Sequence, residues 1–384
     1  MATKASILFI GPEKMGESVF KSQRYKFEGL SKCFDPHFLT RPQKFGFNFR
    51  KISLYDCKFY IVPFSHGPGM VVWLVTSLCM AIFLCRRKNI DVIIAQDPLL
   101  SGFVGYVAKA ITRKKLIIEC HGDWKGPTFR RYHSLLPGRV QDYILGRISA
   151  FLLHKADSIR VVSSYLRKQV KFIVQDKEIF QFPAFMNIDF FLESRREEEN
   201  VDPRSILFVG SPPTLKGLKY LIIALGMILP KYQSARLLVV SENKWEKNIA
   251  QFAEKIHLER NVVFLGELTQ SQLRDWFSRS EMLVLPSVSE GFGRVLVEAM
   301  ACGLPVIGTE VGGITEIIED GKTGFIVSPR DSKALASRIE LILSDFKISR
   351  TLGANARKNI KENYSNNAFF DDYTTLVKHT LLLL

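Results

Sequence analysis

Two glutamates, Glu290 and Glu298, stand eight positions apart and flank the sequence Gly-Phe-Gly-Arg-Val-Leu-Val. The preceding residues 282–286, Met-Leu-Val-Leu-Pro, are typical of a short buried strand, and residues 294–301 have the Leu, Met and Ala content of a helix. We therefore expect Glu290 on a strand-to-helix loop and Glu298 on the second turn of the helix.

The loop between these carboxylates suits an anion. The N–H groups of Gly291, Phe292 and Gly293 are expected to be unpaired at the helix N-terminus, where the helix dipole also favours negative charge. Glycine lets the main chain approach a phosphate closely. The carboxylates can accept hydrogen bonds from hydroxyls of a transferred sugar and of a ribose. The alternative is an ordinary strand–loop–helix unit with two solvated glutamates.

The residues that follow carry a family resemblance. They read Ala-Met-Ala-Cys-Gly-Leu-Pro-Val, then the turn Gly312-Gly313 with Glu316 after it, then Gly-Lys-Thr-Gly-Phe. Together with the glutamate pair, this run resembles the nucleotide-sugar-binding half of the family-4 retaining glycosyltransferases. The resemblance implies an α/β structure of the GT-B type, with two facing Rossmann-like domains, parallel sheets and an interdomain cleft.

A second motif in this half is the loop from Gly210 to Gly217, which follows an apolar run at 205–209. Members of the family carry an Arg just after the glycine and a Lys six residues after it, and both are thought to hold the diphosphate. Lys216 is kept here, whereas Ser211 replaces the Arg. Because serine adds no charge, we expect the diphosphate to bind more weakly than in members that have the arginine. Taken alone, Lys216 also fits a surface lysine.

The motifs of the first half are less specific. Gly11 to Gly16 follow the first apolar run, where the family has a glycine loop near donor and acceptor; a plain turn is the alternative. His121 matches the family histidine that contacts the transferred sugar. A histidine at a strand end is often structural, but the carboxyl edge of a parallel sheet is where such folds bind ligands.

Alternating strands and helices indicate open parallel sheets covered on both faces. The clearest strands are expected at residues 6–10, 91–95, 116–120, 158–162, 205–209, 235–240, 262–265 and 282–286. The charged run 193–203 lacks apolar periodicity and is interpreted as a linker. We predict an acceptor-binding domain at 1–195, a linker at 196–203, a nucleotide-sugar-binding domain at 204–360, and a C-terminal helical segment at 361–384 that packs back toward the first domain.

Composition fits this division. A chain of 384 residues with 47% hydrophobic and 24% charged residues suits two cores and gives no sign of disorder. Six cysteines show no metal-ligand spacing and no disulfide framework, so we expect no metal and a reducing, cytoplasmic location. The short N-terminal apolar run predicts a strand and not a signal peptide.

Charge is uneven, because residues 1–200 carry +13 of the net +15. Such a surface attracts anionic lipid or a phosphorylated acceptor. It could attract nucleic acid too, but no nucleic-acid-binding motif accompanies it. The apolar stretch from Met70 to Cys85 is shorter than the ~20 residues that cross a bilayer. A buried helix is one interpretation, and partial insertion at the inner face of the membrane is the other.

The resemblance implies a metal-independent hexosyltransferase that needs no cofactor besides its nucleoside-diphosphate sugar, with a glycan, glycolipid or polysaccharide as acceptor. Its implied site residues are catalytic Glu290, His121 and Lys216, donor-binding Glu298, Gly291, Phe292, Gly293, Gly210, Ser211, Gly312 and Gly313, and the acceptor-side loop Gly11 and Gly16. Three alternatives stay open: a catalytically weak sugar-nucleotide-binding subunit of a membrane-associated assembly, another GT-B enzyme such as a phosphorylase or epimerase, and a nucleic-acid-binding protein.

Overall fold

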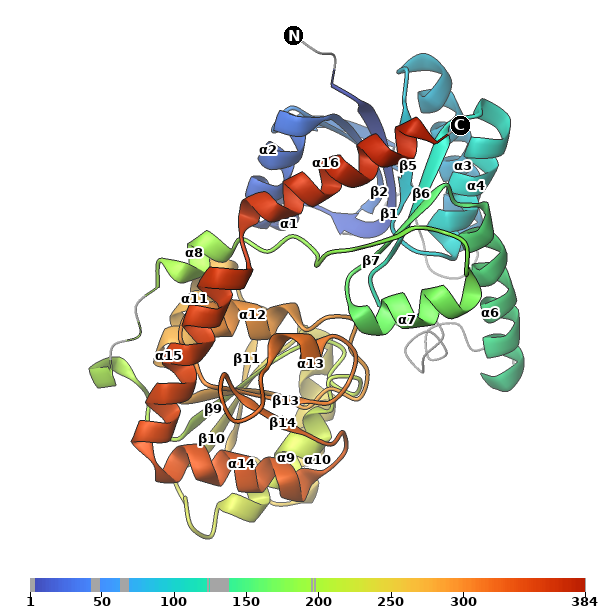
Figure 1. The fold of residues 1–384 in the computed structure, drawn as a ribbon. Helices are drawn as coiled ribbons and strands as arrows, with labels where there is room; N and C mark the ends of the chain where they lie inside the picture. The colour runs from blue at the N-terminus through green and yellow to red at the C-terminus, as the bar shows by residue number, and fades with distance from the viewer. Residues whose placement is uncertain are drawn as a thin grey trace. The chain divides into compact units, whose positions relative to one another are not determined.

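The chain forms two compact units, seen in a computed structural model (Figure 1). The first unit comprises Met1–Phe185 and Asn367–Leu384, and the second Met186–Asn366. The structure describes residues 4–42, 49–62, 69–122, 124, 138–194, 196 and 198–383. Each unit is built on a largely parallel sheet covered by helices, so the predicted α/β class is confirmed.

The first unit holds an eight-stranded sheet in the order β3-β4-β2-β1-β5-β6-β7-β8. The strands are β1 (Ser6–Met15), β2 (Asp35–Pro42), β3 (Arg50–Leu54), β4 (Cys57–Ile61), β5 (Val92–Ala95), β6 (Lys115–Cys120), β7 (Ser158–Val161) and β8 (Ile179–Gln181). Neighbours pair in parallel except β3 and β4, which are antiparallel. The sequence patterns miss β2, β3 and β4 because Asp35, Arg50 and Lys58 interrupt the apolar runs that mark the central strands.

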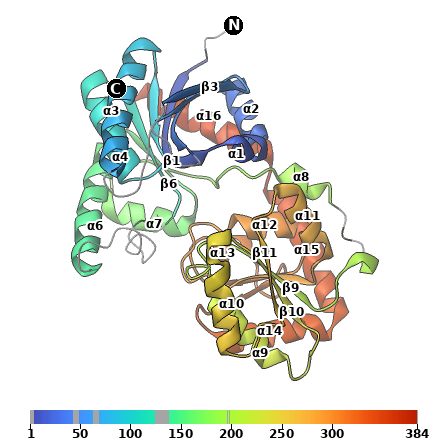
Figure 2. The same cartoon turned by 180° about the vertical axis from the view of Figure 1, so that it is seen from behind.

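Helices cover both faces of this sheet. They are α1 (Glu17–Ser22), α2 (Arg24–Cys33), α3 (Gly69–Arg87), α4 (Leu100–Thr112), α6 (Gly138–Lys155), α7 (Ser164–Ile173) and α16 (Asn366–Leu382). On one face α2 and α16 share a core, in which Phe27 and Tyr373 pack with Phe9 of β1. On the other face α4 packs against both α3 and α6 (Figure 2). The opposite direction of the crossovers from β1 toward β2 and from β5 toward β6 places these helix groups on opposite faces.

The second unit holds a six-stranded parallel sheet in the order β11-β10-β9-β12-β13-β14. Its strands are β9 (Ser205–Val209), β10 (Arg236–Val240), β11 (Val262–Gly266), β12 (Met282–Leu285), β13 (Val306–Thr309) and β14 (Phe325–Val327). The helices are α8 (Ile188–Leu192), α9 (Leu218–Ile228), α10 (Glu246–Lys255), α11 (Gln270–Arg279), α12 (Arg294–Ala301), α13 (Ile314–Ile317), α14 (Ser332–Ser344) and α15 (Phe346–Asn363), with 3-10 turns η1 (Glu198–Asn200) and η2 (Asn243–Trp245). Leu225 of α9 and Ile339 of α14 pack over β9 and β12.

The charged run at 193–203 belongs to the second unit, and the chain enters that unit earlier, between Phe185 and Met186. The main-chain N–H of Asp202 donates to Arg279 O at 2.7 Å, and the two side chains pair at 3.2 Å. Arg196 donates to Glu281 O at 3.3 Å. The charges that suggested a solvated linker are therefore tied to the second sheet; Arg195 and Glu197 lie outside the described residues. The chain returns to the first unit through α16.

Candidate active site

The predicted donor residues meet at one place on the second sheet. Strands β9 and β12 are neighbours, but the chain leaves β9 toward β10 and leaves β12 toward β13, so the strand order reverses between them. Lys216 follows β9, Glu290 follows β12, and Gly312 follows β13. Open α/β sheets bind ligands at the carboxyl edge beside such a switch point.

Lys216 and Glu290 form an ion pair across this switch point. Lys216 Nζ lies 2.6 Å from Glu290 Oε2, and the side chains are 21% and 11% exposed. The Ser287 hydroxyl also donates to Glu290 Oε2, at 3.2 Å. An ammonium has three donors, and the contacts between described residues use one of those of Lys216. The pair is accessible and retains hydrogen-bonding capacity for a ligand.

Two glycines allow the loops around this pair to close tightly. A Cβ on Gly217 would lie 1.8 Å from Pro286 O, and one on Gly312 would lie 1.7 Å from Glu290 O. Both glycines also have positive φ angles, of 69° and 57°. The main-chain N–H of Val288 donates to Leu215 O at 2.8 Å, which joins the two loops directly. A side chain at Gly217 would displace the main chain at Pro286, and one at Gly312 would displace the main chain of Glu290.

Helix α12 begins at Arg294 after Gly293, whose φ of 104° is open to glycine alone. Within the described residues, no protein acceptor is recorded for the N–H groups of Gly291, Phe292 and Gly293. The Phe292 side chain is buried, and its ring lies near that of Tyr364. Phe292 would therefore contact a ligand through its main chain and not through its ring. Main-chain N–H groups that are free at the start of a helix suit an anion, and anion binding by this loop stays a prediction.

Glu298 lies on the second turn of α12 and is only 5% exposed. Its Oε1 is 3.2 Å from Arg294 Nε. Burial raises the pKa of Glu298, and Arg294 offsets part of this effect. A buried carboxylate with this single ion-pair partner would be stabilised by further hydroxyl donors.

Ser211 has partners that the sequence did not predict. Its hydroxyl donates to Glu242 Oε1 at 2.6 Å and accepts from Trp245 Nε1 at 3.2 Å. The residue in the family's arginine position is therefore held by the carboxylate of Glu242, whose Oε2 also lies 2.5 Å from Lys244 Nζ. Gly210 is needed beside it, since a Cβ there would lie 2.7 Å from Lys216 Cγ. Glu242 lies directly after β10, and none of the sequence motifs described above includes it.

His121 belongs to the first unit, at the end of β6. Its Nε2 lies 2.9 Å from Oε2 of the buried Glu119. Glu119 Oε1 accepts from Arg160 Nη1 at 2.7 Å and from the Tyr373 hydroxyl of α16. Burial alone would raise the pKa of Glu119, but Arg160 and His121 hold it well below its usual range. An ionised Glu119 accepts a hydrogen bond from Nε2 of His121 and so favours a proton on that nitrogen.

Sequence reasoning missed the network of Glu119, Arg160 and Tyr373. Its only signal was a charged residue inside each of two otherwise apolar strands, β6 and β7. Gly11 lies inside a strand and not in a loop after it, because β1 continues from Ile10 to Met15 with an irregularity after Ile10. Gly16 then precedes α1. A Cβ on Gly11 would lie 1.7 Å from the Gln96 side chain, which ends β5.

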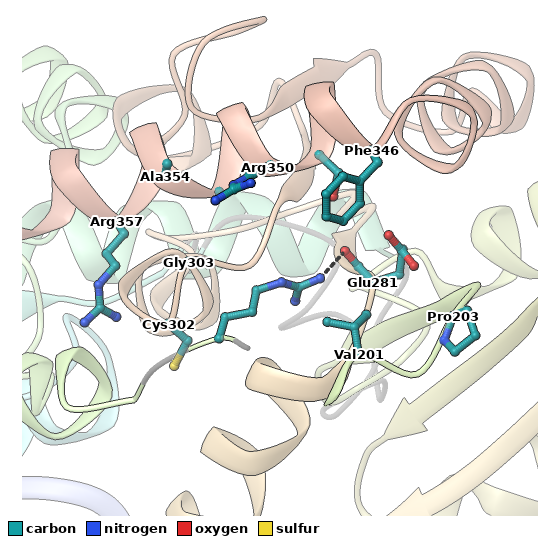
Figure 3. A pocket seen from close by; sticks show the side chains of 12 residues that line it. Val201, Pro203, Glu281, Cys302, Gly303, Phe346, Arg350, Ala354 and Arg357 are labelled. Atoms are coloured by element: carbon teal, nitrogen blue, oxygen red, sulfur yellow. Dashed lines mark hydrogen bonds between the residues drawn. The ribbon is translucent and has the colours of Figure 1, made fainter. Parts of the chain in front are cut away.

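A pocket of about 640 Å³ lies in the second unit at the opposite, amino edge of the sheet, beside Pro203, Glu281 and Gly303 (Figure 3). The Arg357 guanidinium beside it donates to Ser194 O at 2.8 Å and Ala301 O at 2.6 Å. None of the residues predicted to bind the donor lines this pocket. Across the described residues, no cluster of three or more His, Cys, Asp or Glu side chains is placed to hold a metal ion.

Comparison with protein families supports the sequence resemblance. A family model for group 1 glycosyl transferases matches residues 189–359, and one for glycosyltransferase family 4 matches residues 30–179. An uncharacterised glycosyltransferase of Methanocaldococcus jannaschii, MJ1178, is 30% identical over 289 residues, which are 75% of each chain. The capsular polysaccharide biosynthesis glycosyltransferase CapM of Staphylococcus aureus is 25% identical and covers 86% of this chain and 89% of its own.

Solved structures agree on the fold. Sucrose-phosphate synthase from Thermosynechococcus elongatus superposes with a TM-score of 0.82 at 22% identity and covers 98% of this chain and 99% of its own. The Anabaena protein HepE, solved in complex with UDP and glucose, gives a TM-score of 0.74 at 17% identity, covering 97% and 99%. With the sheet topology, the motif positions and these matches together, the chain belongs to family 4 of the glycosyltransferases and has the GT-B fold.

Proposed function

We propose that this glycosyltransferase moves a sugar from a nucleoside diphosphate to a glycan, glycolipid or polysaccharide acceptor, with retention of anomeric configuration and without a metal ion. The observation that carries the proposal is the ion pair of Lys216 and Glu290 beside the N–H groups at the start of α12. Positive and hydroxyl-accepting groups stand next to each other there, as a sugar joined to a diphosphate requires.

The diphosphate is assigned to Lys216 and to the N–H groups of Gly291 to Gly293. As the bond from the anomeric carbon to the diphosphate oxygen breaks, negative charge grows on the leaving group, and these donors stabilise it without a metal. Glu290 accepts from hydroxyls of the transferred sugar and Glu298 from the ribose. HepE has been solved with UDP-glucose, which supports this class of donor.

Among the described residues of the donor site, we find no side chain that we would assign as a nucleophile attacking the anomeric carbon. This favours a front-face displacement without a covalent sugar–enzyme intermediate. The acceptor hydroxyl forms its bond to the anomeric carbon on the face that the diphosphate leaves, and its proton passes to a diphosphate oxygen. His121 contacts the transferred sugar through Nδ1 in this assignment, which rests on the family resemblance.

The decisive experiment is a panel of UDP-, GDP- and ADP-sugars assayed for hydrolysis and for transfer, with and without chelator. Turnover of one donor, unchanged by the chelator and with a product of the same anomeric configuration, is the expected result. Inversion of configuration would overturn the retaining mechanism. Dependence on inorganic phosphate would identify a phosphorylase instead.

A second candidate is a catalytically weak subunit that binds sugar nucleotide within a membrane-associated assembly. The observation in its favour is the bond from Ser211 to Glu242, which puts a carboxylate near the position where the family holds the diphosphate with arginine. Calorimetry separates the two candidates. UDP binding without turnover of any donor in the panel would favour the weak subunit.

The acceptor side is assigned to the first unit, and the protein to the cytoplasmic face of a membrane. This location rests on the net charge of +13 in residues 1–200, which would gather anionic lipid or lipid-linked acceptor. No helix in the described parts of the chain is both long and apolar enough to cross a membrane. Attachment would therefore be peripheral.

A further inference from the structure

Three neighbouring helices of the first unit expose large apolar side chains. On α3 these are Val71, Val72, Val75 and Phe83, spaced so that they follow one side of the helix. Phe103 and Ile111 extend the surface over α4. On α6 the exposed apolar side chains are Val140, Tyr143, Ile144, Ile148 and Phe151. We call this surface the α3–α4–α6 face.

Basic residues gather along one edge of this face. The three helices precede the parallel, adjacent strands β5, β6 and β7, so all three end at the same edge of the sheet. Their ends carry exposed Arg86 and Arg87 in the last turn of α3, Arg113 directly after α4, and Lys155 at the end of α6. In the described residues 69–122 and 138–155, no acidic side chain is exposed; the acidic residues there, Asp91, Asp97, Glu119 and Asp142, are buried or half-buried.

We propose that the α3–α4–α6 face docks on the surface of an anionic lipid bilayer. Its apolar side chains would enter the boundary between headgroups and acyl chains, while its basic edge would pair with lipid phosphates. A contiguous exposed apolar surface rimmed by charge marks an interaction site. The inference deepens the location given in the proposed function, but it requires no sugar transfer to be tested.

Charge complementarity selects lipid over a second copy of the chain. Residues 1–200 carry a net charge of +13, which a second copy would repeat and an anionic bilayer would oppose. The helices also lie flat along the sheet and keep their inner residues, such as Trp73 and Leu84 of α3, in the core. The geometry suits attachment in the plane of the membrane interface and not a span across it.

The first test measures binding of the full chain to vesicles, without donor, by co-flotation. Phosphatidylcholine vesicles containing phosphatidylglycerol should bind the protein, and pure phosphatidylcholine vesicles should bind it much less. Phe83→Ser combined with Ile148→Ser should weaken binding roughly tenfold, because two half-exposed apolar side chains no longer enter the interface. Tyr25→Ser combined with Phe346→Ser is the matched control, since these exposed rings lie on α2 and α15; it should leave binding unchanged.

The second test concerns the basic edge. Arg86→Gln combined with Arg87→Gln should weaken binding to anionic vesicles roughly 10- to 30-fold at low salt, and the difference should shrink at high salt. Lys247→Gln combined with Lys255→Gln removes two exposed charges from α10 in the second unit and should change nothing. Circular dichroism checks that every variant is folded.

Several outcomes would overturn the inference: no binding to either vesicle, equal losses in variants and controls, or a solution dimer that Phe83→Ser with Ile148→Ser dissociates. Donor hydrolysis without vesicles should be the same in all these variants. A wild-type chain that floats with vesicles but turns over no donor would refute the proposed function and leave the lipid surface standing. A wild-type chain that turns over a donor but does not float with vesicles would refute the lipid-binding surface and leave the proposed function standing.

Discussion

The two units each hold a carboxylate–cation pair, and the pairs differ in what surrounds them. Glu119 and Arg160 are each 2% exposed, and the guanidinium also donates to Pro183 O at 2.7 Å and lies 4.1 Å from the centre of the Phe182 ring. Lys216 and Glu290 lie at a sheet edge with fewer partners and greater exposure.

The difference teaches what each pair does. A buried pair has lost its hydration, so it is stable only while every partner is in place, and losing one partner leaves a charge in a medium of low dielectric constant. A pair at an accessible edge keeps part of its hydration and can exchange partners with a ligand. The first pair therefore fastens α16 to the sheet through Tyr373, and the second is suited to bind substrate.

The largest effect is expected from Arg160→Met. It should lower the free energy of unfolding by about 3–5 kcal/mol, because Glu119 would remain buried without its main partner. Lys216→Met is the comparison and should cost less, since the side chains of Lys216 and Glu290 are 21% and 11% exposed against 2% for each member of the first pair. Denaturant unfolding followed by circular dichroism measures both. Equal losses would show that exposure does not separate the two pairs.

The opposite ranking is expected for activity. Lys216→Met should lower kcat about 10²- to 10³-fold through loss of a donor to the leaving group, and Glu290→Ala should abolish transfer while the protein stays folded. Lys219→Met, an exposed lysine on the outer side of α9, is the control and should keep wild-type turnover. Near-normal turnover by Glu290→Ala would refute the site.

Glu298→Ala should mainly weaken donor binding, by about 1.5–3 kcal/mol, through loss of a hydrogen bond to a charged group. Titration calorimetry with the nucleoside diphosphate gives the affinity, and the sugar-free ligand isolates the ribose contact. Glu254→Ala, at an exposed position of α10 outside the donor motifs, provides the control carboxylate. An unchanged Kd for Glu298→Ala would contradict the ribose assignment.

The buried pair of Glu119 and Arg160 should make the free energy of unfolding depend on pH in the acid range. The folded state holds the pKa of Glu119 below its unfolded value of about 4.3, so its contribution to stability is complete above that pH and is lost as the pH falls further. Below that pH the group contributes a slope of up to about 1.4 kcal/mol per pH unit. Glu119→Gln should lose this slope, although it is less stable at pH 7. The free energy of unfolding is measured against pH for the wild type and for Glu119→Gln. Parallel curves from pH 5 to 2 would show that the pKa of Glu119 is not lowered in the folded state.

The smallest effect is expected at Ser211. Ser211→Arg introduces the family's cation, but Glu242 stands 2.6 Å from the present hydroxyl and would neutralise part of the new charge. The double variant Ser211→Arg with Glu242→Gln should bind nucleoside diphosphate more tightly than Ser211→Arg by about 1 kcal/mol. A double-mutant cycle measured by calorimetry isolates the coupling. Purely additive effects would mean that Glu242 does not shield this position.

The sequence predicted the local structure around Glu290 and Glu298 better than the course of the chain from Gly11 to Gly16. The stretch from Glu290 to Glu298 is local, and a glycine-rich loop entering a helix fixes its own geometry through φ angles and the helix N-terminus. The local sequence from Gly11 to Gly16 does not fix the conformation of this segment. Its course as part of β1 depends on pairing with β2. The strands β2 to β4 escaped prediction because each contains charged residues, such as Asp35, Arg50 and Lys58, although β2 and β4 pair with a neighbour on both sides.

By itself the sequence determined the family, the α/β class, the central strands and the residues that form the donor motifs, since these follow from local periodicity and short spacings. Only the tertiary structure decided that Lys216 pairs with Glu290, that Glu242 holds Ser211, and that Tyr373 of the last helix reaches Glu119. The partners in each of these contacts are far apart in the chain. Strand order and helix packing bring them within hydrogen-bonding distance, and no local pattern encodes which distant side chain fills a buried position.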